Sequence, residues 1–89
     1  MTSELLNIGF GNYVHKDKVL AIMAPSSAPM KRLRELAREE GRLVDLTEGR
    51  KTRCLLLMET NHLILSGVMS ETVAQRFSGM TDKAESDEP

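Results

Sequence analysis

The sequence predicts a small α+β domain with a mostly antiparallel sheet, one amphipathic helix and a short C-terminal helix. Short apolar runs bounded by Gly, Pro, Asn or charged residues recur along the chain. A helical periodicity separates the early runs from the later ones, and a second, shorter helical pattern follows them. The order strands, helix, strands, helix is typical of the α+β class. With 89 residues, a single domain is expected, over residues 1–80.

The first elements are predicted to be short strands. Residues 5–14 indicate two extended pieces joined by a turn that contains Gly9 and Gly11. Two glycines one residue apart favour a tight bend or bulge, and without a third they do not form a phosphate loop. Residues 18–24, apolar on both faces from Val19 on, predict a strand internal to a sheet, which Pro25 ends.

The clearest helix comes next. Ser26 or Ser27 can accept a hydrogen bond from its first free amides, Pro29 suits its first turn, and Gly41 is placed to end it. Charged residues of both signs fill its surface, so an amphipathic core helix is favoured over a helix that enters a DNA groove. The apolar stripe that we expect to be buried consists of Met30, Leu33, Leu36 and Ala37.

The second half of the chain predicts three strands and a helix. Residues 43–46 and 52–58 are expected to pair around a basic turn, and residues 62–68 follow a hairpin turn at residues 59–61. Ser70 is expected to cap the last helix, which stops at Gly79. The residues of this helix expected to face inward are Val73, Ala74 and Phe77.

Charge is distributed unevenly along the chain, although the net charge is only −1. Residues 1–80 hold eleven Lys or Arg against nine Asp or Glu, whereas residues 81–89 hold four acids against Lys83. That last segment has no apolar periodicity, so it predicts an acidic, disordered tail. The lone Cys54, the lack of a secretion signal pattern and the lack of a long apolar run predict a cytoplasmic protein without a membrane span.

The residues offer no constellation for catalysis. His15 and His62 lie far apart, neither has metal-ligand spacing with Cys54, and Cys54 lies in an apolar strand. No paired carboxylates, phosphate loop or dinucleotide motif is present. The sequence therefore predicts no enzyme, no cofactor, no metal site and no small-molecule substrate.

Cation placement is the remaining chemical signal. Arg50, Lys51 and Arg53 follow Gly49 between two apolar runs, a position from which they could grip phosphate. Short charge runs are more often solvated turns, and spacing alone favours that interpretation. Lys16 and Lys18 lie just before the apolar part of the strand predicted at 18–24, so the five cations could share one edge of a sheet if the strands are neighbours. Repetition around an oligomer would strengthen such a weak patch.

Five blocks of the chain, taken in order, resemble the RemA family of small bacterial regulators of extracellular-matrix genes. The resemblance runs without a gap from about Ile8 to Phe77. The matching blocks are Asn7-Ile8-Gly9-Phe10-Gly11-Asn12, Ser27-Ala28-Pro29, Gly49-Arg50-Lys51-Thr52-Arg53, His62-Leu63-Ile64-Leu65-Ser66 and Glu71-Thr72-Val73-Ala74-Gln75-Arg76.

The resemblance implies a DNA-binding transcriptional regulator of biofilm matrix genes that assembles into a homo-oligomeric ring and wraps double-stranded DNA around a basic rim. The family's basic contact positions fall on Lys18, Arg50 and Lys51, which Arg53 could support. Two of them are Lys where the family commonly has Arg, and Glu48 replaces an aromatic residue. Lysine lacks the planar fork of arginine, so phosphate holding is expected to persist, while Glu48 weakens the local field.

An alternative from a different class remains open. A structural or interaction ring could use the same basic rim to bind an acidic protein or RNA. A steep fall in binding with salt and a preference for duplex DNA would favour the regulator over this alternative.

Overall fold

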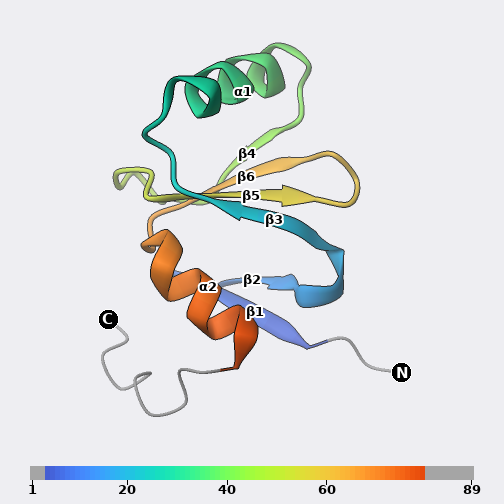
Figure 1. Ribbon diagram of the computed structural model, residues 1–89, viewed down its shortest axis with the longest axis vertical. Helices are drawn as coiled ribbons and strands as arrows, with labels where there is room; N and C mark the ends of the chain where they lie inside the picture. The colour runs from blue at the N-terminus through green and yellow to red at the C-terminus, as the bar shows by residue number, and fades with distance from the viewer. Residues whose placement is uncertain (1–3, 80–89) are drawn as a thin grey trace.

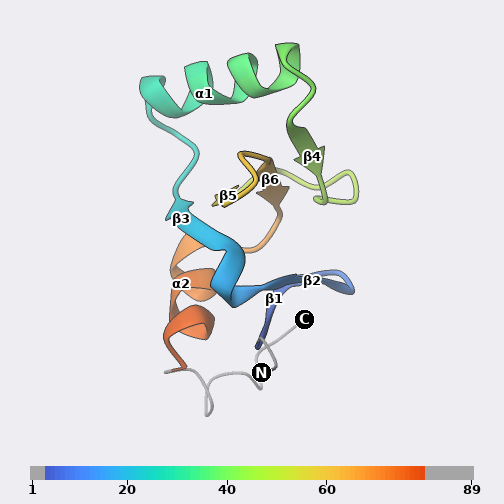
Figure 2. The same ribbon diagram turned by 90° about the vertical axis from the view of Figure 1, so that its right-hand side faces the viewer.

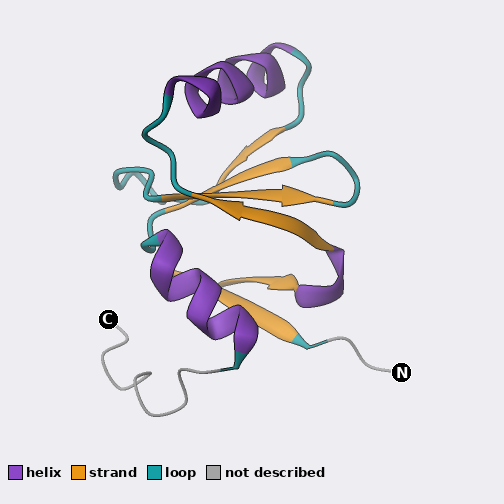
Figure 3. Cartoon of the chain, viewed as in Figure 1, coloured by secondary structure: helices purple, strands orange, loops and turns teal. Residues whose placement is uncertain are grey.

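The computed structural model describes residues 4–79 and has three layers (Figures 1 and 2). Helix α1 lies over one face of a central four-stranded sheet, and helix α2 lies on the other side with a two-stranded sheet. The predicted α+β class is confirmed, with two sheets in place of one. The elements are β1 (Leu5–Gly9), β2 (Asn12–His15), β3 (Val19–Met23), α1 (Ala28–Glu39), β4 (Leu43–Asp45), β5 (Cys54–Met58), β6 (Leu63–Ser66) and α2 (Ser70–Ser78), with a 3-10 turn at Lys16–Lys18 (Figure 3).

The strand order of the central sheet, β3-β5-β6-β4, corrects two predictions. Strands β4 and β5, expected to pair around the basic turn, are separated by β6, which is parallel to β4 and antiparallel to β5. Strand β3, expected to be internal, lies at an edge. Its last residues are nevertheless packed on both faces, with Met23 on the α1 side and Ile22 on the other, whereas Leu20 is 66% exposed. Apolar residues on both faces indicate two covering layers, not two neighbouring strands.

The core is divided in two by the central sheet. Side chains alternate along β5 and β6, so each strand contributes to both halves. The buried residues on the α1 side are Ala37, Leu55, Leu63 and Leu65. Those on the side of α2 and the β1–β2 hairpin are Leu6, Ile8, Cys54, Leu56, Met58, Ile64 and Val73. The continuous apolar run of β5 follows from its position between two covered faces.

The predicted limits of α1 are confirmed. The hydroxyl of Ser27 accepts a hydrogen bond from the backbone N–H of Met30 at 3.4 Å, and Pro29 lies in the first turn. Gly41 follows the C-cap with a φ of +72°, a left-handed conformation that costs glycine little. The chain then turns back toward the sheet and enters β4.

The buried stripe of α1 is narrower than predicted. Ala37 is fully buried, and the half-buried Met30 and Leu33 pack on the same cluster. Leu36 was predicted to be buried, but it is 47% exposed. The buried positions recur at intervals of three and four residues, and Leu36 lies one residue, or about 100°, from Ala37. It therefore falls beside the contact with the sheet.

Helix α2 also departs from the prediction in detail. Met69, not Ser70, occupies the N-cap, and no side chain caps this end. Val73 is buried as predicted, whereas Ala74 is exposed. Gly79 ends the helix as predicted, with a φ of +77°. The predicted acidic tail, residues 81–89, lies outside the described residues.

Candidate nucleic-acid interface

Residues 46–53, here called the basic loop, connect β4 to β5 across the end of β6. Because β4 runs parallel to β6 and β5 runs antiparallel to it, the end of β4 and the start of β5 meet beside the end of β6. In Figure 1 the loop projects from that end of the central sheet. It is therefore a crossover on the rim of the sheet and not a hairpin turn.

Backbone contacts hold the basic loop in place. The backbone N–H and the hydroxyl of the buried Thr47 donate to Oδ1 of Asp45 at 2.9 and 2.7 Å. These hydrogen bonds lower the pKa of the Asp45 carboxyl, with a smaller contribution from the charge of Arg34. The backbone N–H of Arg50 donates to the Thr47 carbonyl at 3.0 Å, and that of Arg53 donates to the Ser66 carbonyl at 2.8 Å. The cations thus start from a fixed backbone.

Arg50 is positioned by an aromatic ring from a distant part of the chain. Its guanidinium lies over the ring of Phe10, 3.9 Å from the centroid, which is within the range of a cation–π contact. Gly67 makes room for this contact, because a Cβ there would lie 3.0 Å from Phe10 and 3.5 Å from the Cβ of Arg50. The aromatic ring of Phe10 therefore restricts the orientations that the Arg50 guanidinium can adopt.

Phe10 itself is held at the turn between β1 and β2. The turn residues around it have positive φ, and Phe10 has a φ of +57°. The side chain of Asn7 accepts from the backbone N–H of Gly9 at 2.8 Å. The amide of Asn12 donates to the carbonyls of Gly9 and Leu46, at 3.2 and 3.4 Å. The turn is therefore tied to the start of the basic loop, and its two glycines form a bend as predicted.

The exposed cations of the basic loop face solvent without acidic partners. Among residues 4–79, no ion pair joins a carboxylate to Arg50, Lys51 or Arg53. Arg53 lies against Met69, with its guanidinium 3.8 Å from Sδ. Cations that stand on a fixed backbone and form no ion pair can bind phosphate without first breaking one.

Lys18 lies elsewhere in the same subunit. It precedes β3, which pairs with the far end of β5, and its Nζ lies 3.6 Å from the carboxylate of Glu59. The five residues of β5 span about 17 Å between that end and Arg53. The expectation that the five cations share one sheet edge is therefore wrong for a single subunit. Arg50, Lys51 and Arg53 lie at one end, and Lys16 and Lys18 at the other.

Cys54 is a core residue, as predicted. It is fully buried at the start of β5, and burial raises the pKa of its thiol to about 11. A neutral buried thiol is a poor nucleophile. Among residues 4–79, no three His, Cys, Asp or Glu side chains are grouped to hold a metal ion. The absence of enzymatic activity stays a prediction.

The raised pKa of Cys54 predicts a pH dependence of stability. The unfolded thiol ionises near its ordinary pKa of 9.0, whereas the folded thiol stays neutral up to about pH 11. The free energy of unfolding of the wild type should therefore fall, relative to Cys54→Ala, by up to about 3 kcal/mol as pH rises between these values. Urea unfolding of both proteins across this range measures the difference. Parallel pH profiles would contradict the assignment.

Two positions relevant to the site were not identified from sequence. Phe10 was assigned only to a bend, and Arg34 only to the mixed surface of α1. Arg34 points back to the basic loop, where its Nη2 donates to the hydroxyl of Thr52 at 3.5 Å. Both contacts join segments that are distant in the chain, so no local pattern indicates them.

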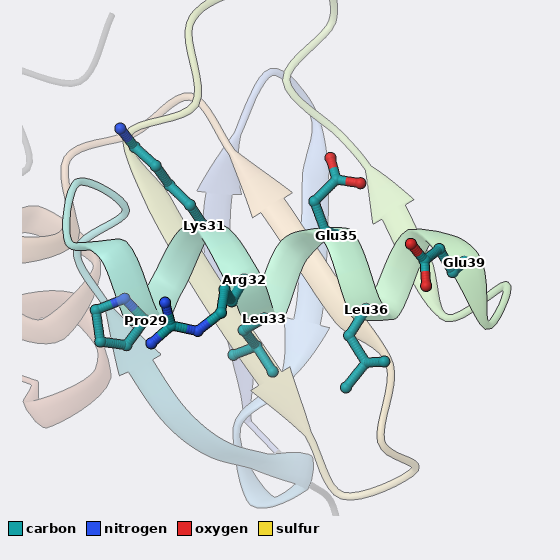
Figure 4. Close-up of a pocket in the computed structure, with 7 residues that line it drawn as sticks. All are labelled: Pro29, Lys31, Arg32, Leu33, Glu35, Leu36 and Glu39. Atoms are coloured by element: carbon teal, nitrogen blue, oxygen red, sulfur yellow. The ribbon is translucent and has the colours of Figure 1, made fainter.

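A shallow hollow on α1 is separate from the basic loop. Pro29, Leu33 and Leu36 line it with charged residues around them (Figure 4). Leu36, which lies beside the contact of α1 with the sheet, therefore lines this hollow. No helix within residues 4–79 is both long and apolar enough to cross a membrane.

Comparison with known proteins supplies an independent result. Residues 5–77 match the RemA-like family, described as extracellular matrix regulatory protein A-like. A protein of Nitratidesulfovibrio vulgaris is 56% identical over 77 residues, covering 86% of this chain and 88% of the relative. One of Fervidobacterium nodosum is 59% identical over 73 residues, covering 82% and 78%. Both relatives are named "Putative regulatory protein".

Proposed function

Because the chain belongs to the RemA-like family, we propose that it is a DNA-binding transcriptional regulator that acts as a ring-shaped homo-oligomer. Repeated basic patches of Lys18, Arg50, Lys51 and Arg53 hold duplex DNA by its phosphates. The observation that carries the proposal is the basic loop, whose three cations stand on a fixed backbone without acidic partners among residues 4–79. The resemblance to matrix regulators extends the proposal to control of biofilm matrix genes in the bacterial cytoplasm.

Assembly into a ring gives the two separated groups of cations a common role. Within one subunit Lys18 lies at the far end of β5 from the basic loop. In a ring, DNA passing over several subunits meets both groups in turn. The exposed pair of Lys18 with Glu59 has a distance of 3.6 Å and opposes phosphate binding little, since such pairs contribute about 0–1 kcal/mol. Each further subunit adds contacts that are intramolecular once the first has formed.

The alternative is a ring that binds an acidic protein or RNA through the same rim. The small number of aromatic residues favours duplex DNA over single strands, since single-strand binding relies on base stacking. Phe10, the ring nearest the cations, is already covered on one face by Arg50. Duplex binding needs only phosphate contacts of the kind that the loop offers.

The test combines mass and binding measurements on the wild-type chain. Native mass spectrometry or light scattering gives the oligomeric state, and fluorescence anisotropy gives affinity for duplex DNA over a series of salt concentrations. RNA of equal length and polyglutamate serve as competitors. The proposal requires an oligomer, a preference for duplex DNA and a linear fall of log affinity with log salt. A monomer, or preferential binding of either competitor, would overturn it.

Phe10 provides a prediction specific to the geometry of Arg50. Phe10→Leu should keep an apolar side chain but remove the cation–π contact, which contributes about 0.5–1 kcal/mol at an exposed site. We expect the affinity for duplex DNA to fall about two- to fivefold for each subunit that contacts the DNA, because Arg50 loses its fixed orientation. Phe10→Tyr, which retains the aromatic face, should restore affinity. Equal affinities for the Leu and Tyr variants would show that the ring does not position Arg50.

A further inference from the structure

A second basic surface adjoins the basic loop where the loop passes the first half of α1. A groove runs between the helix and the loop, and cations from both segments line it. Lys31 and Arg34 come from the helix, and Lys51 comes from the loop. The complete lining consists of Pro25, Ser26, Lys31, Arg34, Lys51 and Thr52.

Arg34 is the fixed member of this group. It is half-buried on α1, and it donates to the hydroxyl of Thr52 at 3.5 Å. A guanidinium has five N–H donors in a planar fork, so one contact with Thr52 leaves others available to a ligand. Lys31 and Lys51 are exposed and can move their ammonium groups toward the same point.

The acidic side chains nearby have other partners. Glu35 accepts from Arg38 at 2.8 Å, and Asp45 accepts from the backbone and hydroxyl of Thr47. Arg34 also acts on Asp45 through charge, but no ion pair between them is formed within 4.0 Å among the described residues. The groove therefore presents three cations to solvent and no carboxylate in its lining.

We propose that this groove binds a phosphate group, with Arg34 as its central ligand and Lys31 and Lys51 on either side. The hydroxyls of Ser26 and Thr52 line the same groove and can donate to phosphate oxygens. The phosphate belongs either to the backbone of duplex DNA or to a free phosphorylated small molecule. In the first case the inference rests on the proposed function, and it extends the phosphate-binding surface from the basic loop onto α1.

The helix offers a matched control for Arg34. Arg32 is the same residue type on the same helix, but two residues correspond to about 200° around the axis. Arg32 lines the hollow with Leu36 and is not among the residues that line the groove (Figure 4). Arg34→Ala and Arg32→Ala thus remove equal charge from opposite sides of the helix.

The first experiment measures duplex affinity against salt for the wild type and these two variants. Arg34→Ala should bind about tenfold more weakly, and its salt slope should flatten by roughly 0.9 for each phosphate that it no longer neutralises, while Arg32→Ala keeps the slope. Circular dichroism and native mass verify fold and assembly. If Arg34→Ala does not fold, the exposed Lys31→Ala takes its place with the same expectation.

The second experiment titrates inorganic phosphate into isotope-labelled protein and follows the amide signals of Ser26 and Thr52. A response in the wild type that disappears in Arg34→Ala, without a change in duplex binding, assigns the groove to a free phosphorylated ligand. A changed salt slope without a response to phosphate assigns it to DNA. Failure of the wild type to bind duplex overturns the proposed function alone, since the phosphate titration still tests the groove. The inference is overturned if phosphate causes no response in the wild type and if Arg34→Ala and Arg32→Ala bind duplex DNA with the same affinity and the same salt slope.

Discussion

Replacing both Arg50 and Lys51 with alanine is expected to abolish duplex binding while leaving fold and assembly unchanged. The hydrogen bonds that hold the basic loop come from its backbone and from Thr47, so they survive the change. Every subunit of the ring loses two cations, so all the contacts that one DNA molecule makes around the ring are weakened at once. The avidity that these contacts provide together is then lost, and binding disappears. The slope of log affinity against log salt should flatten by roughly 0.9 for each phosphate that the variant no longer neutralises. Anisotropy titrations at several salt concentrations measure both quantities.

Two further variants make this experiment selective. Arg32→Ala removes a cation from α1 outside the basic loop and should reduce affinity far less. Lys51→Arg should keep or strengthen binding, because a guanidinium can bridge two phosphate oxygens where an ammonium cannot. If the Arg50/Lys51 double variant retains wild-type affinity and slope, the loop is a solvated turn. The family's contact positions would then not apply to this chain.

Local sequence signals predicted both ends of α1 and the C-terminal end of α2, because the interactions that define those ends are local. Ser27 begins α1 through a bond to an amide three residues on, and Gly41 and Asn61 adopt the positive φ that their turns require. The three cations of the basic loop were predicted together because they are adjacent in the chain. Nothing beyond neighbouring residues is needed for any of these features.

Features that depend on contacts between distant segments were not predicted. Placement of β6 between β4 and β5 depends on pairs such as Leu46 with Leu65, whose backbones bond at 3.0 Å. The same order sends Lys18 to the opposite end of the sheet from Arg50. The contacts of Phe10 with Arg50 and of Arg34 with Thr52 join residues 40 and 18 positions apart. A site assembled from several segments therefore requires the fold before its members can be identified.

Among the substitutions considered, Leu55→Ala is expected to lower the free energy of unfolding most. Leu55 is fully buried in the middle of the sheet, on the side that α1 covers, among Ala37, Leu63 and Leu65. Leu55→Ala should reduce the free energy of unfolding by about 2–5 kcal/mol, since neighbours on a hydrogen-bonded strand cannot collapse fully into the space. That is a large part of the roughly 5–15 kcal/mol available to a domain.

Leu36→Ala is the matched comparison, because the same atoms are removed from a side chain that is 47% exposed. Its effect on the free energy of unfolding should be well under half that of Leu55→Ala, since little of the removed surface was packed. Urea unfolding of both variants at equal protein concentration measures the difference, and native mass identifies any change in assembly. Equal costs at the two positions, with assembly unchanged, would mean that Leu36 and not only Leu33 packs against the sheet. The hollow in Figure 4 would then have to close in solution.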